Sequence, residues 1–144
     1  MTQRHYTESV KDARELDPQF KSMLHHHWME EMQHAQLDTL MVQAIAETMS
    51  KSEIDEAIDG YTAIGGFLDA GLSQQMVFDG QAFEAATGRR LSEAEWETFV
   101  NVQRQANRWT YLGSGMSHPK FLETLGELSG EKQLMIANAA SAYS

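Results

Sequence analysis

Apolar residues recur at intervals of three and four along most of this 144-residue sequence, and this spacing constrains the fold more than any other feature. The longest series is Ile54, Ala57, Ile58, Tyr61, Ile64, Leu68, Leu72, Met76, Phe83 and Ala86. Such spacing places apolar side chains on one face of a helix, and no stretch shows a convincing period-two alternation typical of a strand. The sequence therefore predicts an all-α protein.

Capping residues predict where the two longest helices begin and end. Asp17 followed by Pro18 is typical of an N-cap and a first helical position, because Asp accepts a free backbone N–H and Pro has none to satisfy. This helix is predicted to run to about Met49. The serines of MSKSEID restart a helix, and Gly88 is placed to end it.

A third helix is predicted from the capping box that Ser92 forms with Glu95. It is expected to reach about Leu112, where Gly113 and Gly115 would end it.

The remaining sequence predicts smaller elements around these long helices. Two short helices are expected over 117–128 and 131–143. Residues 1–16 are polar and charged and are predicted to form an N-terminal arm, followed by one helical domain over 17–144. The domain is long enough to bury a core.

Composition removes several classes of function. The net charge of −10 would repel a phosphate backbone, so a nucleic-acid partner is not expected. Because the sequence has no cysteine, a metal would have to be held by histidine and carboxylate. No apolar run is long enough for a membrane span, and the N-terminal residues lack the apolar segment of a secretory signal, so a cytoplasmic protein is expected.

The stretch HHHWMEEMQHAQLD, residues 25–38, gathers histidines and carboxylates within the first long helix. At about 100° per residue, one arc roughly 100° wide contains polar residues between apolar ones. Its members are Phe20, Leu24, His27, Glu31, His34, Asp38, Met41, Val42, Ile45 and Met49. A face that is apolar at both ends is expected to point into a core, where an unpaired carboxylate is unfavourable.

His27, Glu31 and His34 form an HxxxExxH pattern, so their side chains project to one side within two turns. Two imidazoles and one carboxylate are ligands suited to non-haem iron, and these residues are predicted to bind a metal. Asp38, one turn further, is placed to accept the second N–H of His34.

Other ionisable residues are weaker candidates for the same site. His25 and His26 lie on other sides of the helix, and Glu30 lies about 100° from Glu31, towards the edge of the face. Asp79 falls on the apolar stripe of the second long helix and is an additional ligand candidate, or else an acid hydrogen-bonded to a neighbouring helix.

Residues 31–34, Glu-Met-Gln-His, match the ExxH signature of the ferritin-like di-iron carboxylate superfamily, and the upstream His27 resembles the HxxxExxH ligand helix of its aryl-amine N-oxygenase branch. The specific match covers roughly residues 20–49. The resemblance implies a ferritin-like helical bundle, with two long antiparallel helices, a third helix and short C-terminal helices. In this bundle His27, Glu31 and His34 would bind one iron. The resemblance also implies that Glu31 is placed to bridge to a second iron.

A complete di-iron site in such bundles takes ligands from four helices, whereas this sequence has one ExxH motif. Three explanations are open: a missing N-terminal half supplies the other ligands, a two-fold dimer duplicates them, or a 2-His-1-carboxylate triad holds a single metal. The first two are favoured, and a dimer is expected because a half-site helix would expose an apolar face.

The predicted function is a non-haem iron or di-iron oxidoreductase that activates dioxygen, with a small-molecule substrate and with Zn or Mn able to replace iron. Two alternatives belong to other classes. One is a metal-free helical interaction module with a vestigial site, and the other is metal storage or sensing without catalysis.

Overall fold

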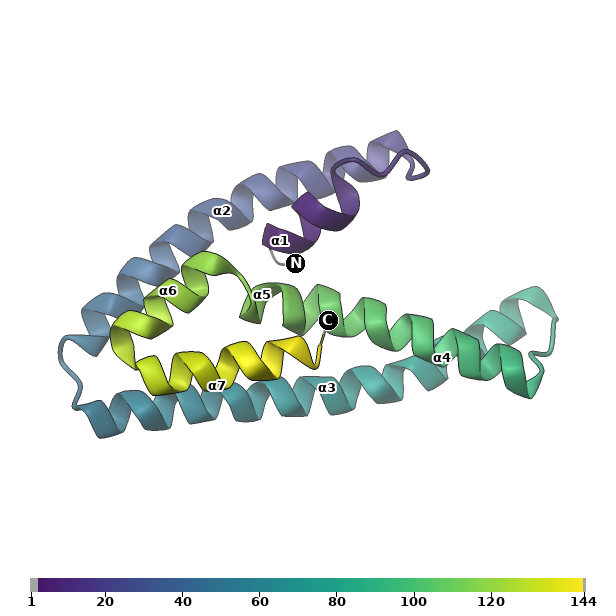
Figure 1. The fold of residues 1–144 in the computed structure, drawn as a ribbon. Coiled ribbons are helices and arrows are strands. Elements are labelled where there is room, and N and C mark those ends of the chain that lie inside the picture. The colour runs from purple at the N-terminus through teal and green to yellow at the C-terminus, as the bar shows by residue number, and fades with distance from the viewer. Residues whose placement is uncertain (1–2, 144) are drawn as a thin grey trace.

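The structure, a computed structural model, describes residues 3–143, and over these residues it is helical without a strand (Figure 1). Its elements are α1 (Gln3–His5), the π-helical turn η1 (Tyr6–Val10), α2 (Pro18–Ala46), α3 (Lys51–Thr87), α4 (Glu93–Arg108), the π-helical turn η2 (Trp109–Gly113), α5 (Ser114–Met116), α6 (Pro119–Leu128) and α7 (Gly130–Ser141). The predicted all-α class is confirmed.

The predicted helix starts are also confirmed by their caps. The Asp17 side chain accepts a hydrogen bond from the Phe20 N–H at 2.9 Å, and Pro18 opens α2. Ser50 forms a capping box at the start of α3, and Ser92 forms one at the start of α4. Gly88 ends α3 in the left-handed region with φ 66°, a conformation that glycine adopts without strain.

The segment predicted to be a polar arm is partly helical and packs against the rest of the chain. Tyr6 and Val10, one helical turn apart, are buried against Leu24 of α2. Arg4 donates a hydrogen bond to the Ser117 Oγ at 2.8 Å, which ties the segment to the end of α5. Residues 3–10 therefore hold the N-terminal part of α2 in place.

The predicted glycine stop after the third helix is wrong. Beyond α4 the chain continues as η2 and α5 to Met116. Gly113 is instead a point of close approach, because a Cβ there would lie 2.6 Å from the Tyr143 carbonyl oxygen. The absence of a side chain lets the end of the chain pack against η2.

The core lies where η2, α5, α6 and α7 meet the N-terminal half of α3. Its buried residues are Ile58, Leu112, Met116, Leu125, Ile136 and Ala140. Figure 1 shows α6 and α7 within the angle between α2 and α3, with α4 folded back along the far half of α3.

One partly buried ion pair joins the two arms of the α3–α4 hairpin. Arg108 donates two hydrogen bonds to the Asp69 carboxylate, from Nε and from Nη2, each at 2.7 Å. The Arg108 guanidinium also lies 5.6 Å from the Tyr143 ring centroid. This bidentate geometry, stronger than a simple surface pair, fixes α4 and the C-terminal residues on α3.

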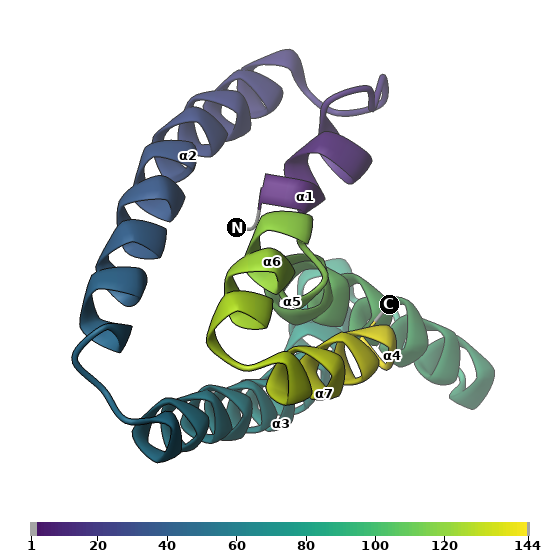
Figure 2. The same cartoon turned by 60° about the vertical axis from the view of Figure 1, so that its left-hand side comes forward.

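The two long helices, α2 and α3, were predicted to lie antiparallel in a bundle, but they do not pack along each other. They diverge from their connection at residues 47–50, and Figure 2 shows α2 standing apart from the body formed by α3 to α7. The main contacts of α2 are with α1, η1 and α6. In the described part of the chain, no helix is both long enough and apolar enough to cross a membrane.

Substitution by alanine is expected to have opposite effects on stability at two glycines of α3. At Gly80 a Cβ would overlap the Trp96 ring of α4, so Gly80→Ala is expected to lower the free energy of unfolding by about 1–3 kcal/mol. At Gly60 a Cβ would meet nothing within 4 Å, so Gly60→Ala is expected to raise it by about 0.5–1 kcal/mol. Urea unfolding followed by circular dichroism measures both, and equal effects would contradict the α3–α4 packing.

Candidate metal centre

The predicted ligands lie together at the middle of α2. The Glu31 Oε1 atom is 3.8 Å from His27 Nε2 and 3.7 Å from His34 Nδ1. One carboxylate oxygen is thus flanked by a ring nitrogen from the preceding turn and one from the following turn. The distances exceed those of a hydrogen bond.

This cluster is open to solvent, and the expectation that its face points into the core of the chain is wrong. The side chains of His27, Glu31 and His34 are 43%, 34% and 56% exposed. Ion pairs this exposed contribute little to stability, about 1 kcal/mol at most. The grouping therefore adds little to the stability of the fold.

The types of the three ligands suit a transition metal, but the distances between them are longer than in a bound site. Two ligands bound about 2.1 Å from one ion lie about 3.0–3.4 Å apart, slightly closer than Glu31 Oε1 is to either histidine nitrogen. A metal would require the two imidazoles to move closer to the Glu31 carboxylate. Within residues 3–143, no group of three or more His, Asp or Glu is placed closely enough to hold a metal ion by itself.

The additional candidates do not complete a site within the chain. Asp38 and Glu30 are on α2 and exposed. Asp79 lies on α3, partly buried beside the Gly80–Trp96 contact, and its Oδ1 accepts a hydrogen bond from Gln75 Nε2 at 2.7 Å. Its partner is thus on its own helix, rather than on the neighbouring helix that one interpretation of the sequence predicted.

An aromatic cluster next to the triad was missed from the sequence. The hydroxyl of Tyr6, which is buried, lies 3.0 Å from His25 Nδ1, and its ring stacks on Trp28 with centroids 5.0 Å apart. The signal that would have found it is the spacing of four between Tyr6 and Val10 in a polar segment. His25 therefore serves the packing of η1 on α2, and its Nδ1 is engaged there.

The exposed His26 is also occupied locally, because its Nδ1 lies 2.7 Å from the Ser22 carbonyl oxygen. The prediction that His25 and His26 lie off the ligand face fits these contacts.

Several hollows among residues 3–143 lie away from the triad. An apolar pocket of about 170 Å³ at the C-terminal end of α2 is lined by Val42, Ile45, Ala46, Met49, Ile54, Ala57 and Leu128. It is small beside the 300–1,000 Å³ of typical ligand sites, but an open depression of about 550 Å³ adjoins it, with Gln43, Glu47 and Glu127 in its wall.

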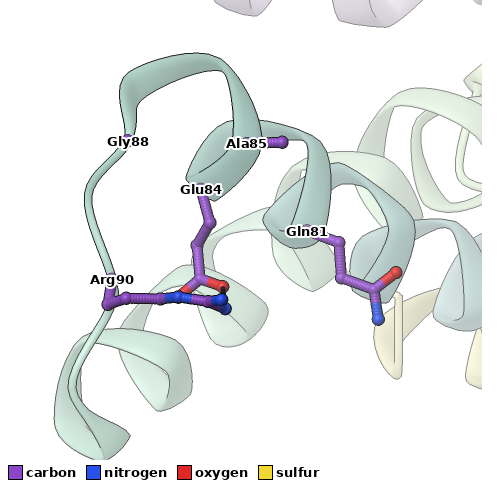
Figure 3. Close-up of a pocket in the computed structure, with 5 residues that line it drawn as sticks. All are labelled: Gln81, Glu84, Ala85, Gly88 and Arg90. Atoms are coloured by element: carbon purple, nitrogen blue, oxygen red, sulfur yellow. Dashed lines mark hydrogen bonds and ion pairs between the residues drawn. The ribbon is translucent and has the colours of Figure 1, made fainter.

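Another open depression of about 350 Å³ lies at the α3–α4 turn, with Gln81, Glu84 and Arg90 in its wall (Figure 3). The Glu84 carboxylate accepts hydrogen bonds from the Leu91 N–H at 2.7 Å and from Arg90 Nη1 at 3.1 Å. These bonds, the first above all, hold the pKa of Glu84 below its ordinary value. The Glu84 carboxylate is therefore engaged in hydrogen bonds that stabilise the α3–α4 turn.

Comparison with known proteins adds no relative: no family model, no curated protein and no solved structure matches this chain.

Proposed function

We propose that His27, Glu31 and His34 hold non-haem iron and that the chain is a ferritin-like protein that activates dioxygen. The observation that carries the proposal is the convergence of two ring nitrogens on one oxygen of Glu31, within 3.8 Å and on one rigid helix. A helix fixes such ligands without ordering a loop.

The chemistry of the ligands supports iron over softer metals. Imidazole and carboxylate donors suit Fe, Zn and Mn, and the chain has no thiolate. Two histidines and one carboxylate leave coordination positions open, where bound iron would supply oxygen activation. The protein's part is to hold the ligands, with Asp38 placed one turn away to orient His34.

The remaining ligands must come from outside α2. The triad alone fits a single ion, and a second copy or a further segment would complete a two-metal site. The same source would close the site against water and would bring helices beside α2, as a ferritin-like bundle requires.

A second candidate function is a metal-free helical interaction module. It is favoured by the exposure of large apolar side chains along α2, among them Met23, Leu37, Leu40, Met41 and Ile45. The two candidates differ in one respect that is easily measured, which is whether metal changes the protein.

The test is an anaerobic titration with ferrous iron, and with cobalt(II) as a spectroscopic probe, of the wild type and of three variants. We expect Glu31→Gln and His34→Ala to weaken binding at least tenfold, since each loses one of the proposed ligands. His26→Ala is the matched control, because His26 is exposed, lies one position from the site and should bind as the wild type does. Equal binding by all four proteins would contradict the assignment.

A further inference from the structure

The exposed face of α2 carries a repeat that the structure leaves unexplained. Its positions alternate in spacing between four and three over eight residues: Phe20, Leu24, His27, Glu31, His34, Asp38, Met41 and Ile45. We call these eight residues the α2 stripe. An average spacing of 3.5 residues is the pattern by which one helix packs along another in a coiled coil.

No helix of the described chain runs along the α2 stripe. Phe20, Met41 and Ile45 are 46%, 52% and 55% exposed. Leu24 is the exception, because Tyr6 and Val10 cover it from the adjoining face. Phe20 at one end of the stripe and Met41 and Ile45 at the other are thus available to a partner, and Ile45 also lines the apolar pocket near Leu128.

The accessible surface of the whole chain, of which α2 is one part, exceeds that of a compact protein and leaves room for a partner contact. The accessible area is 9667 Å², against about 7,500 Å² for a compact protein of 16.2 kDa. Burying the excess of about 2,200 Å² on each of two copies would give an interface within the 2,000–5,000 Å² range of obligate dimers.

The order of residue types along the α2 stripe is self-complementary when the helix is reversed. Its residues pair about a point between Met32 and Gln33, apolar with apolar and histidine with acid. The pairs are Phe20 with Ile45, Leu24 with Met41, His27 with Asp38, and Glu31 with His34. A two-fold axis requires this self-complementarity, because residue i then meets residue j while j meets i.

We propose that a second copy of this chain packs antiparallel along α2, about a two-fold axis that passes between the two helices at the level of Met32 and Gln33. Glu31 then lies opposite the partner's His34, and His27 lies opposite the partner's Asp38. The apolar ends close the interface on both sides of this polar centre.

Other arrangements of the same helix are less complementary. Parallel pairing would set Glu31 and Asp38 each opposite its own copy, which brings like charges together. Sliding the antiparallel pair by seven residues would set Glu31 opposite the partner's Met41 and His27 opposite the partner's Ile45. Charged groups would then be buried against apolar ones.

In this arrangement the second copy would supply the missing ligands of the metal centre. This part of the inference rests on the function proposed above. The axis lies at the level of the triad, so two copies of His27, Glu31 and His34 would meet within two turns of helix. A shared cation would also offset the repulsion between the two strongly acidic chains, each with a net charge of −10.

The register can be tested by disulfide trapping, because the chain has no cysteine of its own. Phe20→Cys and Ile45→Cys proteins are mixed and oxidised, in parallel with and without metal. We expect a cross-linked dimer in the mixture and little in Phe20→Cys alone, whose two thiols would lie about 37 Å apart at 1.5 Å per residue. Circular dichroism confirms that each variant is helical.

Three outcomes would overturn the pairing: cross-linking of Phe20→Cys with itself, no cross-link in the mixture, or a monomeric unmodified protein in sedimentation analysis at micromolar concentration. Failure of the pairing is distinguishable from failure of the metal site. Metal binding without the cross-link would reject the pairing alone, whereas the cross-link without metal binding would support the pairing and reject the proposed function.

Discussion

Replacing Ile136 by alanine lowers the free energy of unfolding by about 2–5 kcal/mol, which corresponds to a fall of about 10 °C in Tm for a chain of this size. Ile136 is fully buried where α7 meets α3, η2 and α6. Removing three carbons there loses apolar burial and leaves a cavity that the surrounding helices fill only in part. Chemical unfolding followed by circular dichroism measures the change.

The matched control for this prediction is Leu134→Ala on the same helix. Leu134 is 65% exposed, so its truncation should change the free energy of unfolding by about 0.5 kcal/mol or less. A loss at Leu134 as large as that at Ile136 would mean that the core is elsewhere, or that an interface covers this side of α7.

Adding metal to the metal-free protein is expected to raise its thermal stability. A ligand that binds only the folded state contributes about 2.7 kcal/mol at a concentration 100-fold above its Kd, or about 5–10 °C in Tm for a chain of this size. Thermal unfolding is recorded with excess ferrous iron under anaerobic conditions and again after addition of a chelator.

The His34→Ala variant separates a specific metal site from general ion effects. Its helix should be intact, since His34 is exposed and alanine favours helix, but its Tm should not respond to iron. A wild-type Tm that is indifferent to both iron and chelator would favour the metal-free interaction module.

Local features of the fold were predictable from the sequence because they depend on a few neighbouring residues. The capping boxes at Ser50 and Ser92 each form between side chains three residues apart, and Gly88 ends its helix through its own backbone. The helical class followed from the apolar spacing in the same way.

Features that depend on distant contacts were not predictable. Gly113 looked like a helix stop, but the chain continues as helix to Met116, and the missing side chain instead lets Tyr143, thirty residues later, pack there. Residues 1–16 looked like a polar arm because only one i,i+4 pair of apolar residues, Tyr6 and Val10, points to packing, and charged residues surround it.

The candidate site shows the same division. The side chains of His27, Glu31 and His34 were predictable as a group, since a helix places positions 27, 31 and 34 on one side whatever its surroundings. Their burial was not, because it depends on what lies against α2, and in the chain the long helices diverge instead of packing together.

Native mass spectrometry after anaerobic loading with ferrous iron tests most directly whether the centre of α2 is a metal site, because it counts metal ions and chains in one species. We predict iron retained by the wild type and by His26→Ala, in a species of two chains, and lost from Glu31→Gln. Iron-free wild type, or wild type and Glu31→Gln with the same iron content, would contradict the metal site.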